Sequence, residues 1–274
     1  ANSAEKPDLI LLTLKAYDDA EAARTLAPNI HETQSVVSYL KGINNESTLS
    51  GELGEARELP ATHTTPLQSP EPGTIRVARV RGIGLAGSHP QIEPFQKELK
   101  NAGFLVRSYT NPDRMKWSKL LTNIVSNASS AILGWTAKQV FDHPLTAQLE
   151  INALREAVDV MRRCGHTPQN LPGVQVAILG RAVYLPSALT RKLLGLIVNR
   201  GRGEKKPSLH YDIGRGRSEI AWLNGAVANY GKKLGVPTPI NQMLTQTLLD
   251  LVHKRRSHEE FMNQPGALIQ RVST

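Results

Sequence analysis

The sequence predicts an α/β fold over residues 1–112, followed by an all-helical domain over residues 113–274. In the first part, short apolar runs alternate with helix-like segments, which is typical of a sheet covered by helices. From Asp113 onward, apolar residues recur at helical spacing instead. A chain of 274 residues is also long enough to form two domains.

The first part begins with the continuous apolar run Leu9–Leu14, as expected for a buried parallel strand. The next segment, Ala16–Leu26, is rich in alanine and predicts a helix. The later elements are a strand at Ser35–Leu40, a short helix at Asn45–Leu53, a loop or edge strand at Pro60–Pro72, a strand at Thr74–Val80, a helix at Pro94–Gly103 and a strand at Phe104–Tyr109. This order predicts an α/β layer with a partly antiparallel flank.

Helical periodicity dominates the second part. The predicted helices are Met115–Leu133, Pro144–Cys164, a short one at Ala182–Val198, Ser218–Leu234 and Ile240–Lys254. The helix from Ser218 has well-defined ends, because Ser218 is a favourable N-cap and Gly235 follows a basic last turn. The basic, glycine-containing segment Asn199–Lys206 predicts a loop.

The composition narrows the class of protein. Hydrophobic residues make up 40% and charged residues 21%, which is ordinary for a globular domain. No stretch approaches the roughly eighteen apolar residues that a transmembrane helix needs, so we expect no membrane partner. The single cysteine, Cys164, excludes an internal disulfide and suits a reducing compartment, so a cytoplasmic location is expected.

The net charge of +9 is unevenly distributed. Residues 1–111 contain 11 Lys and Arg against 13 Asp and Glu, whereas residues 112–274 contain 22 against 11. The second part should therefore attract anions. Because its basic residues are scattered and aromatic residues are few, we expect no nucleic-acid partner, and a phosphate-rich dinucleotide or a keto acid would use the same potential.

A lysine and two asparagines stand out in the helix predicted at Met115–Leu133. Lys119, Asn123 and Asn127 stand four residues apart, which places them on one helix face with a drift of roughly 40° per step. Apolar residues fill most of the remaining circumference, so the helix should be largely buried. These polar groups need partners: either an anionic or carbonyl-bearing small molecule, or a carboxylate and nearby loops of the chain itself.

A glycine motif follows the strand predicted at Thr74–Val80. Gly82–Gly87 fits the dinucleotide pattern Gly-x-Gly-x-x-Gly. However, Ser88-His89-Pro90 interrupts the expected helix start, and no acidic residue ends the following strand, although Arg107 could contact a 2′-phosphate. We therefore interpret the motif as a glycine-bearing strand and not as a phosphate loop.

Further motifs link the chain to a known family. The stretch Arg215–Val227 runs on to Gly231–Pro239, and together with the Lys-x-x-x-Asn-x-x-x-Asn helix it resembles the C-terminal domain of the ketopantoate reductase (2-dehydropantoate 2-reductase) family. Asp8–Asp18 resembles that family's strand followed by a cofactor-contacting lysine. The resemblance covers nearly the whole chain. It implies an incomplete Rossmann-like NADP-binding domain over residues 1–112 and a helical substrate and catalytic domain over residues 113–274.

The resemblance implies hydride transfer from NADPH to the C2 ketone of ketopantoate, giving pantoate for pantothenate and coenzyme A biosynthesis. Lys119 matches the catalytic lysine that protonates the forming alkoxide. Glu219 matches an acid that orients Lys119, the substrate or the nicotinamide ribose. The remaining matches are the substrate-binding residues Asn123, Asn127 and Ser208 and the cofactor-binding residue Lys15, and no metal is implied.

The chain departs from the family pattern at several points. Lys41-Gly42 stands where the family usually has Asn-Gly, with the Asn near the nicotinamide and substrate, and Ala137 replaces a substrate-contacting Asn of some members. Both departures concern the identity of the keto acid more than the reaction class. The family's phosphate loop precedes the strand matched by Leu9–Leu14, so we expect it upstream of Ala1, and we expect residues 1–274 alone to bind NADPH poorly.

Several alternatives stay open at this point. The protein could be another NAD(P)-dependent 2-hydroxyacid dehydrogenase, or a truncated non-catalytic homologue that acts as an interaction module. The choice between NADPH and NADH is also open. A homodimer formed through the helical domain is a further expectation.

Overall fold

The computed structural model describes residues 7–31, 33–43, 45–54, 57–68, 71–77, 79–202 and 207–272. The chain divides into two compact units, which are residues 1–119 with 169–175 and residues 120–168 with 176–274. The division falls inside helix α4 (Pro112–Ile124), whereas the sequence placed it before Asp113. The two units are described separately below.

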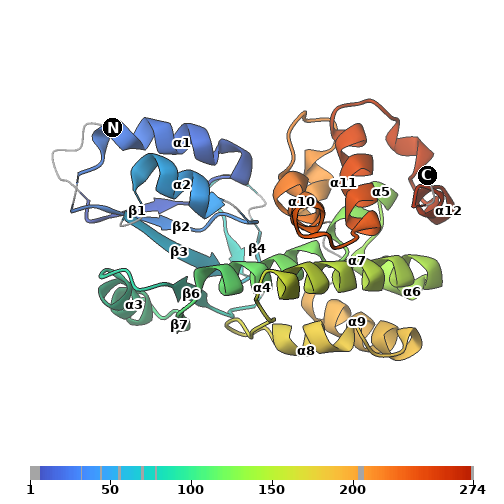
Figure 1. The fold of residues 1–274 in the computed structure, drawn as a ribbon, viewed down its shortest axis with the longest axis horizontal. Helices are drawn as coiled ribbons and strands as arrows, with labels where there is room; N and C mark the ends of the chain where they lie inside the picture. The colour runs from blue at the N-terminus through green and yellow to red at the C-terminus, as the bar shows by residue number, and fades with distance from the viewer. Residues whose placement is uncertain are drawn as a thin grey trace. The chain divides into compact units, whose positions relative to one another are not determined.

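A five-stranded sheet forms the centre of the first unit (Figure 1). Its strands, in spatial order, are β1 (Leu9–Leu12), β2 (Ser35–Ser38), β3 (Glu58–His63), β6 (Ile83–Ala86) and β7 (Val106–Tyr109). Strands β3 and β6 are antiparallel, and all the other neighbouring pairs are parallel. The predicted α/β layer with an antiparallel element is therefore confirmed.

Helices cover both faces of this sheet. Successive strand residues point to opposite faces, and Val36 and Val37 of β2 are both fully buried. Val36 packs with residues of α1 (Asp19–Leu26) and α2 (Asn45–Leu53), whereas Val37 packs with Phe95 of α3. Figure 1 shows α1 and α2 on one side of the sheet and α3 (Ile92–Asn101) on the other. Short 3₁₀ turns flank α1, η1 at Ala16–Asp18 and η2 at Ala27–Asn29.

Two strand predictions need correction. The segment Pro60–Pro72 was expected as a loop or edge strand, but β3 lies in the middle of the sheet, with Leu59 and Ala61 fully buried. Proline lacks an N–H donor, which usually keeps it out of central strands. Of the strand expected at Thr74–Val80, residue 78 lies outside the described residues. The described strand is β5 (Arg76–Val77), which pairs with β4 (Leu67–Gln68) in a separate ribbon and not with the main sheet.

The glycine motif at Gly82–Gly87 contains strand β6, as interpreted from the sequence. A Cβ atom added to Gly84 would lie only 3.0–3.1 Å from atoms of Tyr109, Met115 and Thr62. Glycine is therefore needed here because neighbouring side chains pack tightly against the strand, and not because a phosphate approaches the backbone.

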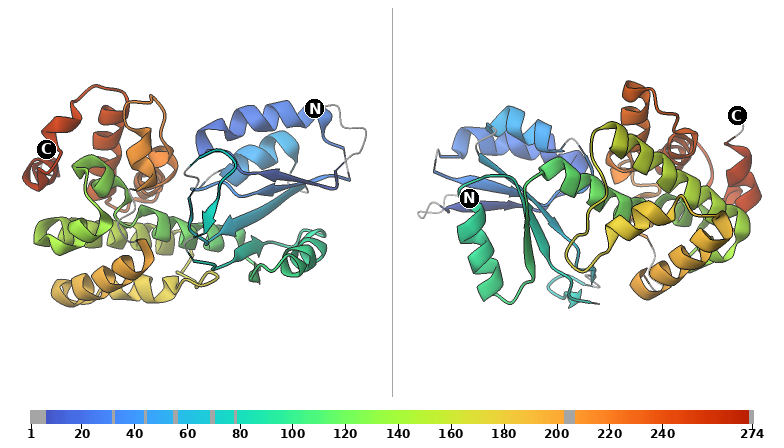
Figure 2. Two further views of the ribbon diagram at one scale, coloured as in Figure 1. Left: turned by 180° about the vertical axis from the view of Figure 1, so that it is seen from behind. Right: turned by 60° about the horizontal axis from the view of Figure 1, so that its bottom comes forward.

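The second unit is helical. Besides the end of α4, its helices are α5 (Asn127–Leu133), α6 (Ala137–Asp142), α7 (Pro144–Arg163), α8 (Val176–Ala182), α9 (Ser187–Arg202), α10 (Asn224–Leu234), α11 (Pro239–Val252) and α12 (Pro265–Gln270). The described part of this unit also contains the 3₁₀ turns η4 (Ser208–Asp212), η5 (Glu219–Trp222) and η6 (His258–Glu260). Helix α7 contacts α6, α8, α9, α10, α11 and α12, and Figure 2 shows α9 running beside it.

The helix predicted at Met115–Leu133 is divided in two. Ser126 separates α4 from α5 and adopts a left-handed conformation with φ of 50°. Glu150 of α7 holds this break, because its buried carboxylate accepts hydrogen bonds from the Ser126 N–H (2.7 Å) and from Ser129 Oγ (2.5 Å). A carboxylate near a helix N-terminus is also favoured by the helix dipole. Buried tertiary contacts thus override the helical periodicity of the sequence.

The helix predicted at Ser218–Leu234 is likewise divided, into η5 and α10. Its predicted ends are confirmed: the Ser218 side chain accepts a hydrogen bond from the Ile220 N–H, and Gly235 ends α10 in a left-handed conformation with φ of 68°. Leu223 interrupts the middle with φ of −107° and ψ of −102°. The break detaches the first turn, which carries Glu219, from α10.

Within the described ranges, no helix is long and apolar enough to cross a membrane. In the same ranges, no group of three or more His, Cys, Asp and Glu residues is arranged to hold a metal ion.

Candidate active site

Three basic residues lie where parallel strands of the first unit end. Lys15 follows β1, Lys41 follows β2 and His63 is the last residue of β3. Because these three strands run parallel, their carboxyl ends meet at one edge of the sheet. Ligands of open α/β sheets bind beyond the carboxyl ends of the strands. This edge is therefore the place in the first unit where an anionic ligand is expected.

Helix α4 is tied to the same edge by Lys116. This lysine is 3% exposed, and its Nζ donates to the carbonyl oxygens of Ser38 (3.3 Å) and Leu40 (3.2 Å), which end and follow β2. Lys119 lies about one helical turn further along α4 and is half-buried. The sequence analysis did not select Lys116, because nothing in the sequence distinguishes a lysine that binds backbone carbonyls from one that faces a ligand.

His63 is a second residue that the sequence analysis missed. Its Nδ1 lies 3.2 Å from the Thr65 carbonyl oxygen. Burial lowers the pKa of His63, the positive charges of Lys119 and Lys41 lower it further, and only the Thr65 carbonyl acts to raise it. His63 is therefore subject to the positive charges of both lysines. Because Pro60–Pro72 was predicted as a loop or edge strand, the sequence analysis did not place His63 at the end of a central strand.

In the second unit, Asn123 offers a hydrogen-bond donor. It lies four residues after Lys119 on the same helix and is half-buried. Its Nδ2 atom is buried and has no hydrogen-bond partner among the described residues. A buried amide without a partner is costly, and a carboxylate, carbonyl or hydroxyl oxygen of a ligand would satisfy it.

Asn127 and Ser208, the two residues of this unit for which the family resemblance also predicts substrate binding, contact each other. The Asn127 Nδ2 donates to the Asn123 carbonyl oxygen (3.1 Å) and to Ser208 Oγ (3.2 Å). Its Oδ1 accepts from the Leu209 N–H (3.3 Å). Asn127 is 5% exposed, whereas Ser208 is exposed. The amide of Asn127 thus joins α5 to η4, and Ser208 is the more accessible of the two. Their roles toward a substrate stay predictions.

Glu219 begins η5 and is 1% exposed. Asp212 fixes this turn, because its carboxylate accepts from Ser218 Oγ (2.9 Å) and from the Glu219 N–H (3.3 Å). A carboxylate buried to this degree requires partners. The turn η5 packs against η4, which carries Ser208. The catalytic or cofactor role of Glu219 stays a prediction.

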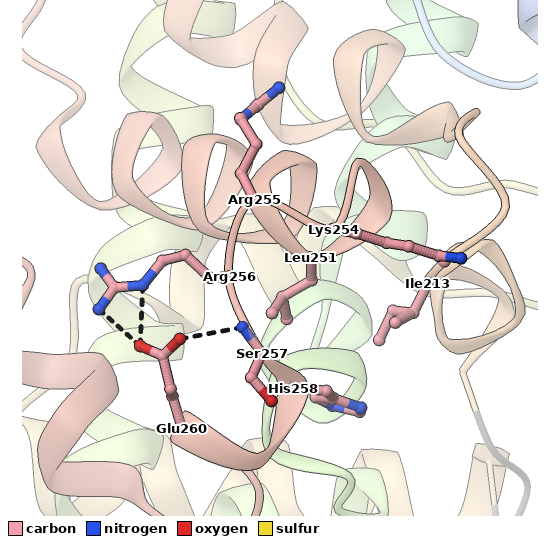
Figure 3. A pocket seen from close by; sticks show the side chains of 9 residues that line it. Ile213, Leu251, Lys254, Arg255, Arg256, Ser257, His258 and Glu260 are labelled. Carbon is pink, nitrogen blue, oxygen red and sulfur yellow. Dashed lines mark hydrogen bonds and ion pairs between the residues drawn. The ribbon is translucent and has the colours of Figure 1, made fainter.

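A pocket of about 470 Å³ lies elsewhere in the second unit (Figure 3). Its lining includes Lys254, Arg256, His258 and Glu260, and none of the predicted site residues. Arg256 is paired with Glu260 at 2.7 Å, so that part of its charge is already balanced. Because the pocket and the predicted site have no residue in common, we treat the two as separate.

Comparison with known proteins identifies the family. The model of the family described as ketopantoate reductase PanE/ApbA matches residues 1–90, and the model of its C-terminal part matches residues 111–252. A 2-dehydropantoate 2-reductase of Pyrococcus horikoshii is 27% identical over 87% of this chain and 74% of its own length.

Two solved structures show the same fold. A PanE/ApbA family ketopantoate reductase from Ralstonia eutropha aligns with a TM-score of 0.74 and 23% identity, over 90% of this chain and 76% of its own. A D-mandelate dehydrogenase in complex with NADH and anilino(oxo)acetate aligns with a TM-score of 0.76 and 18% identity, over 92% of this chain and 79% of its own. The two family matches together span most of the chain, and the chain belongs to the ketopantoate reductase family.

Proposed function

We propose that this protein reduces ketopantoate to pantoate with NADPH. The observation that supports this best lies on α4: the cationic side chain of Lys119 and the unpartnered buried amide of Asn123 occupy positions one turn apart. A cation for a reacting carbonyl oxygen and an amide for a substrate oxygen are the groups that reduction of a 2-keto acid requires.

The chemistry follows from charge development. When bound, a reduced nicotinamide cofactor would supply the hydride for C2 of the keto acid. As C2 accepts hydride, negative charge grows on the carbonyl oxygen, and Lys119 donates a proton to it, which gives the 2-hydroxy acid. Asn123 and Ser208 hold the substrate oxygens, and Glu219 orients Lys119 or the bound molecules.

The first unit has features that suit a nicotinamide dinucleotide. Lys15 lies at the carboxyl edge of the parallel strands, where an α/β sheet binds dinucleotides. Its positive charge would bind a phosphate of the cofactor. We infer NADPH over NADH from the family resemblance, and kcat/KM measured with each cofactor decides between them.

The reaction is tested by following NADPH oxidation by the full-length protein with ketopantoate and with simpler 2-keto acids. Oxidation with ketopantoate supports the proposal. Oxidation with other 2-keto acids alone would indicate a different 2-hydroxyacid dehydrogenase. No oxidation with any of them would favour the non-catalytic interaction module. A homodimer formed through the helical unit stays a prediction, which sedimentation of the pure protein can test. A cytoplasmic location also stays a prediction.

The two asparagines should respond differently to replacement. Asn123→Ala should raise KM for the keto acid about three- to tenfold with little change in kcat, because one neutral hydrogen bond contributes roughly 0.5–1.5 kcal/mol and is shared by ground and transition states. Asn127→Ala should lower stability by roughly 1–3 kcal/mol, because it leaves buried partners unsatisfied. Steady-state kinetics and urea unfolding of both variants separate the two roles, and equal behaviour of the variants would contradict this assignment.

Lys41 should affect the choice of substrate. It stands where the family usually has an asparagine, and its ammonium favours a keto acid with an additional negative charge. In the Lys41→Asn variant, kcat/KM for ketopantoate should rise relative to that for 2-oxoglutarate, which carries a second carboxylate. A strict preference of the wild type for ketopantoate, unchanged in the variant, would refute this role.

A further inference from the structure

His63 has no role in the function proposed above, but it lies at the same edge of the sheet as Lys15 and Lys41, which do have proposed roles. It is the last residue of β3, and the parallel register of β2 and β3 places it at the edge where Lys41 follows β2. The two Lys116 hydrogen bonds to the Ser38 and Leu40 carbonyls fix the first half of α4 at the same edge. Lys119 lies one turn beyond Lys116 on this helix and belongs to the same unit as His63.

The imidazole has a defined tautomer. A carbonyl oxygen only accepts hydrogen bonds, so the 3.2 Å contact with Thr65 requires the proton on Nδ1. In the neutral ring, Nε2 then carries the lone pair. Thr65 itself is held in place, because its Oγ1 accepts hydrogen bonds from the backbone N–H groups of Arg81 (3.0 Å) and Gly82 (3.2 Å).

The surroundings keep the ring neutral. Burial is the largest effect that lowers the pKa of His63 below the ordinary 6.5, followed by Lys119 on α4 and, more weakly, Lys41 after β2. The register partner of His63 on β6 is Ile83, which carries no charge. The positive charges of Lys119 and Lys41 therefore add to the effect of burial, and a pKa below 6.5 leaves the His63 ring uncharged near pH 7.

We propose that neutral His63 is a positioning residue for Lys119, whose ammonium it holds in place through Nε2 for protonation of the substrate. This inference rests on the role proposed for Lys119. Protonation of His63 removes the lone pair and adds a positive charge beside Lys119, so that the ammonium is displaced. Activity should then fall as the pH drops through the pKa of His63, which lies below 6.5.

The first test does not depend on turnover. The pKa of His63 is measured by NMR titration of its ring in the full-length protein and in the Lys119→Met variant, with His63→Gln used to assign the signal. Removal of the neighbouring positive charge should raise the pKa of His63, because the charged ring is no longer repelled. An unchanged pKa would overturn the proposal, even if no keto acid proves to be a substrate.

The second test uses the pH profile of kcat. Glutamine offers an acceptor oxygen near the place of Nε2 and does not titrate, so His63→Gln should keep kcat at pH 8 within about threefold and lose the acidic limb. His63→Lys, which is permanently charged, should lower kcat at least tenfold at every pH. The exposed His31 provides the matched control, and His31→Gln should keep the wild-type profile. An acidic limb that persists in His63→Gln would reject the positioning role.

Discussion

Replacing Lys119 with alanine should lower kcat by a factor on the order of 10² to 10⁴, the range for loss of a positioned general acid. The expected loss corresponds to about 3–5 kcal/mol of transition-state stabilisation. It should appear in kcat because the negative charge on the substrate oxygen develops only as the hydride arrives. Steady-state NADPH oxidation by the full-length variant measures it.

A second lysine provides the control for this prediction. Lys138 of α6 is exposed and forms an ion pair with Asp142 one turn away. Pairs of this kind contribute little to stability, so Lys138→Ala should keep both kcat and KM. If Lys119→Ala retained the wild-type kcat, Lys119 would not be the acid, and the assignment of the site would fail.

The largest loss of stability is expected for Glu150→Ala. This carboxylate is 2% exposed and accepts from the Ser126 N–H and Ser129 Oγ, both in the buried interior of the helical unit. Its removal leaves a cavity and two unsatisfied donors, and each unsatisfied group costs roughly 1–3 kcal/mol. We expect the free energy of unfolding to fall by about 3–5 kcal/mol in urea titrations.

Two variants bracket this prediction. Glu150→Gln keeps one acceptor oxygen and should lose less stability than Glu150→Ala. Asp142→Ala removes an exposed carboxylate from a surface pair and should change the free energy of unfolding by less than about 1 kcal/mol. Equal, small effects of Glu150→Ala and Asp142→Ala would show that the α4–α5 break is not held by Glu150.

The order of elements could be predicted from the sequence, but the helix breaks could not. The apolar strand at Leu9 and the helix at Pro144 follow from local periodicity and from proline at the first helical turn. The left-handed residue at Ser126 depends instead on Glu150, which is far away in sequence, and no local pattern contains that information.

The candidate site shows the same limit. The spacing of Lys119 and Asn123 marks one helix face, and the resemblance to a family adds Ser208 and Glu219. The place of His63 depends on β3 lying in the middle of the sheet, which the prolines around it argued against. The anchoring of Lys116 to the end of β2 likewise arises from a contact between segments distant in sequence.

The proposed hydride transfer is tested most directly with NADPH that carries deuterium at C4 of the nicotinamide. Both hydrogens at C4 are replaced by deuterium, so that a deuteride is transferred from either face of the nicotinamide. The full-length protein is incubated with this cofactor and ketopantoate, and the product is analysed by mass spectrometry. We predict pantoate with one deuterium at C2, formed in equal amount to the NADPH consumed. NADPH consumption without deuterated pantoate, or no consumption at all, would contradict the proposed function.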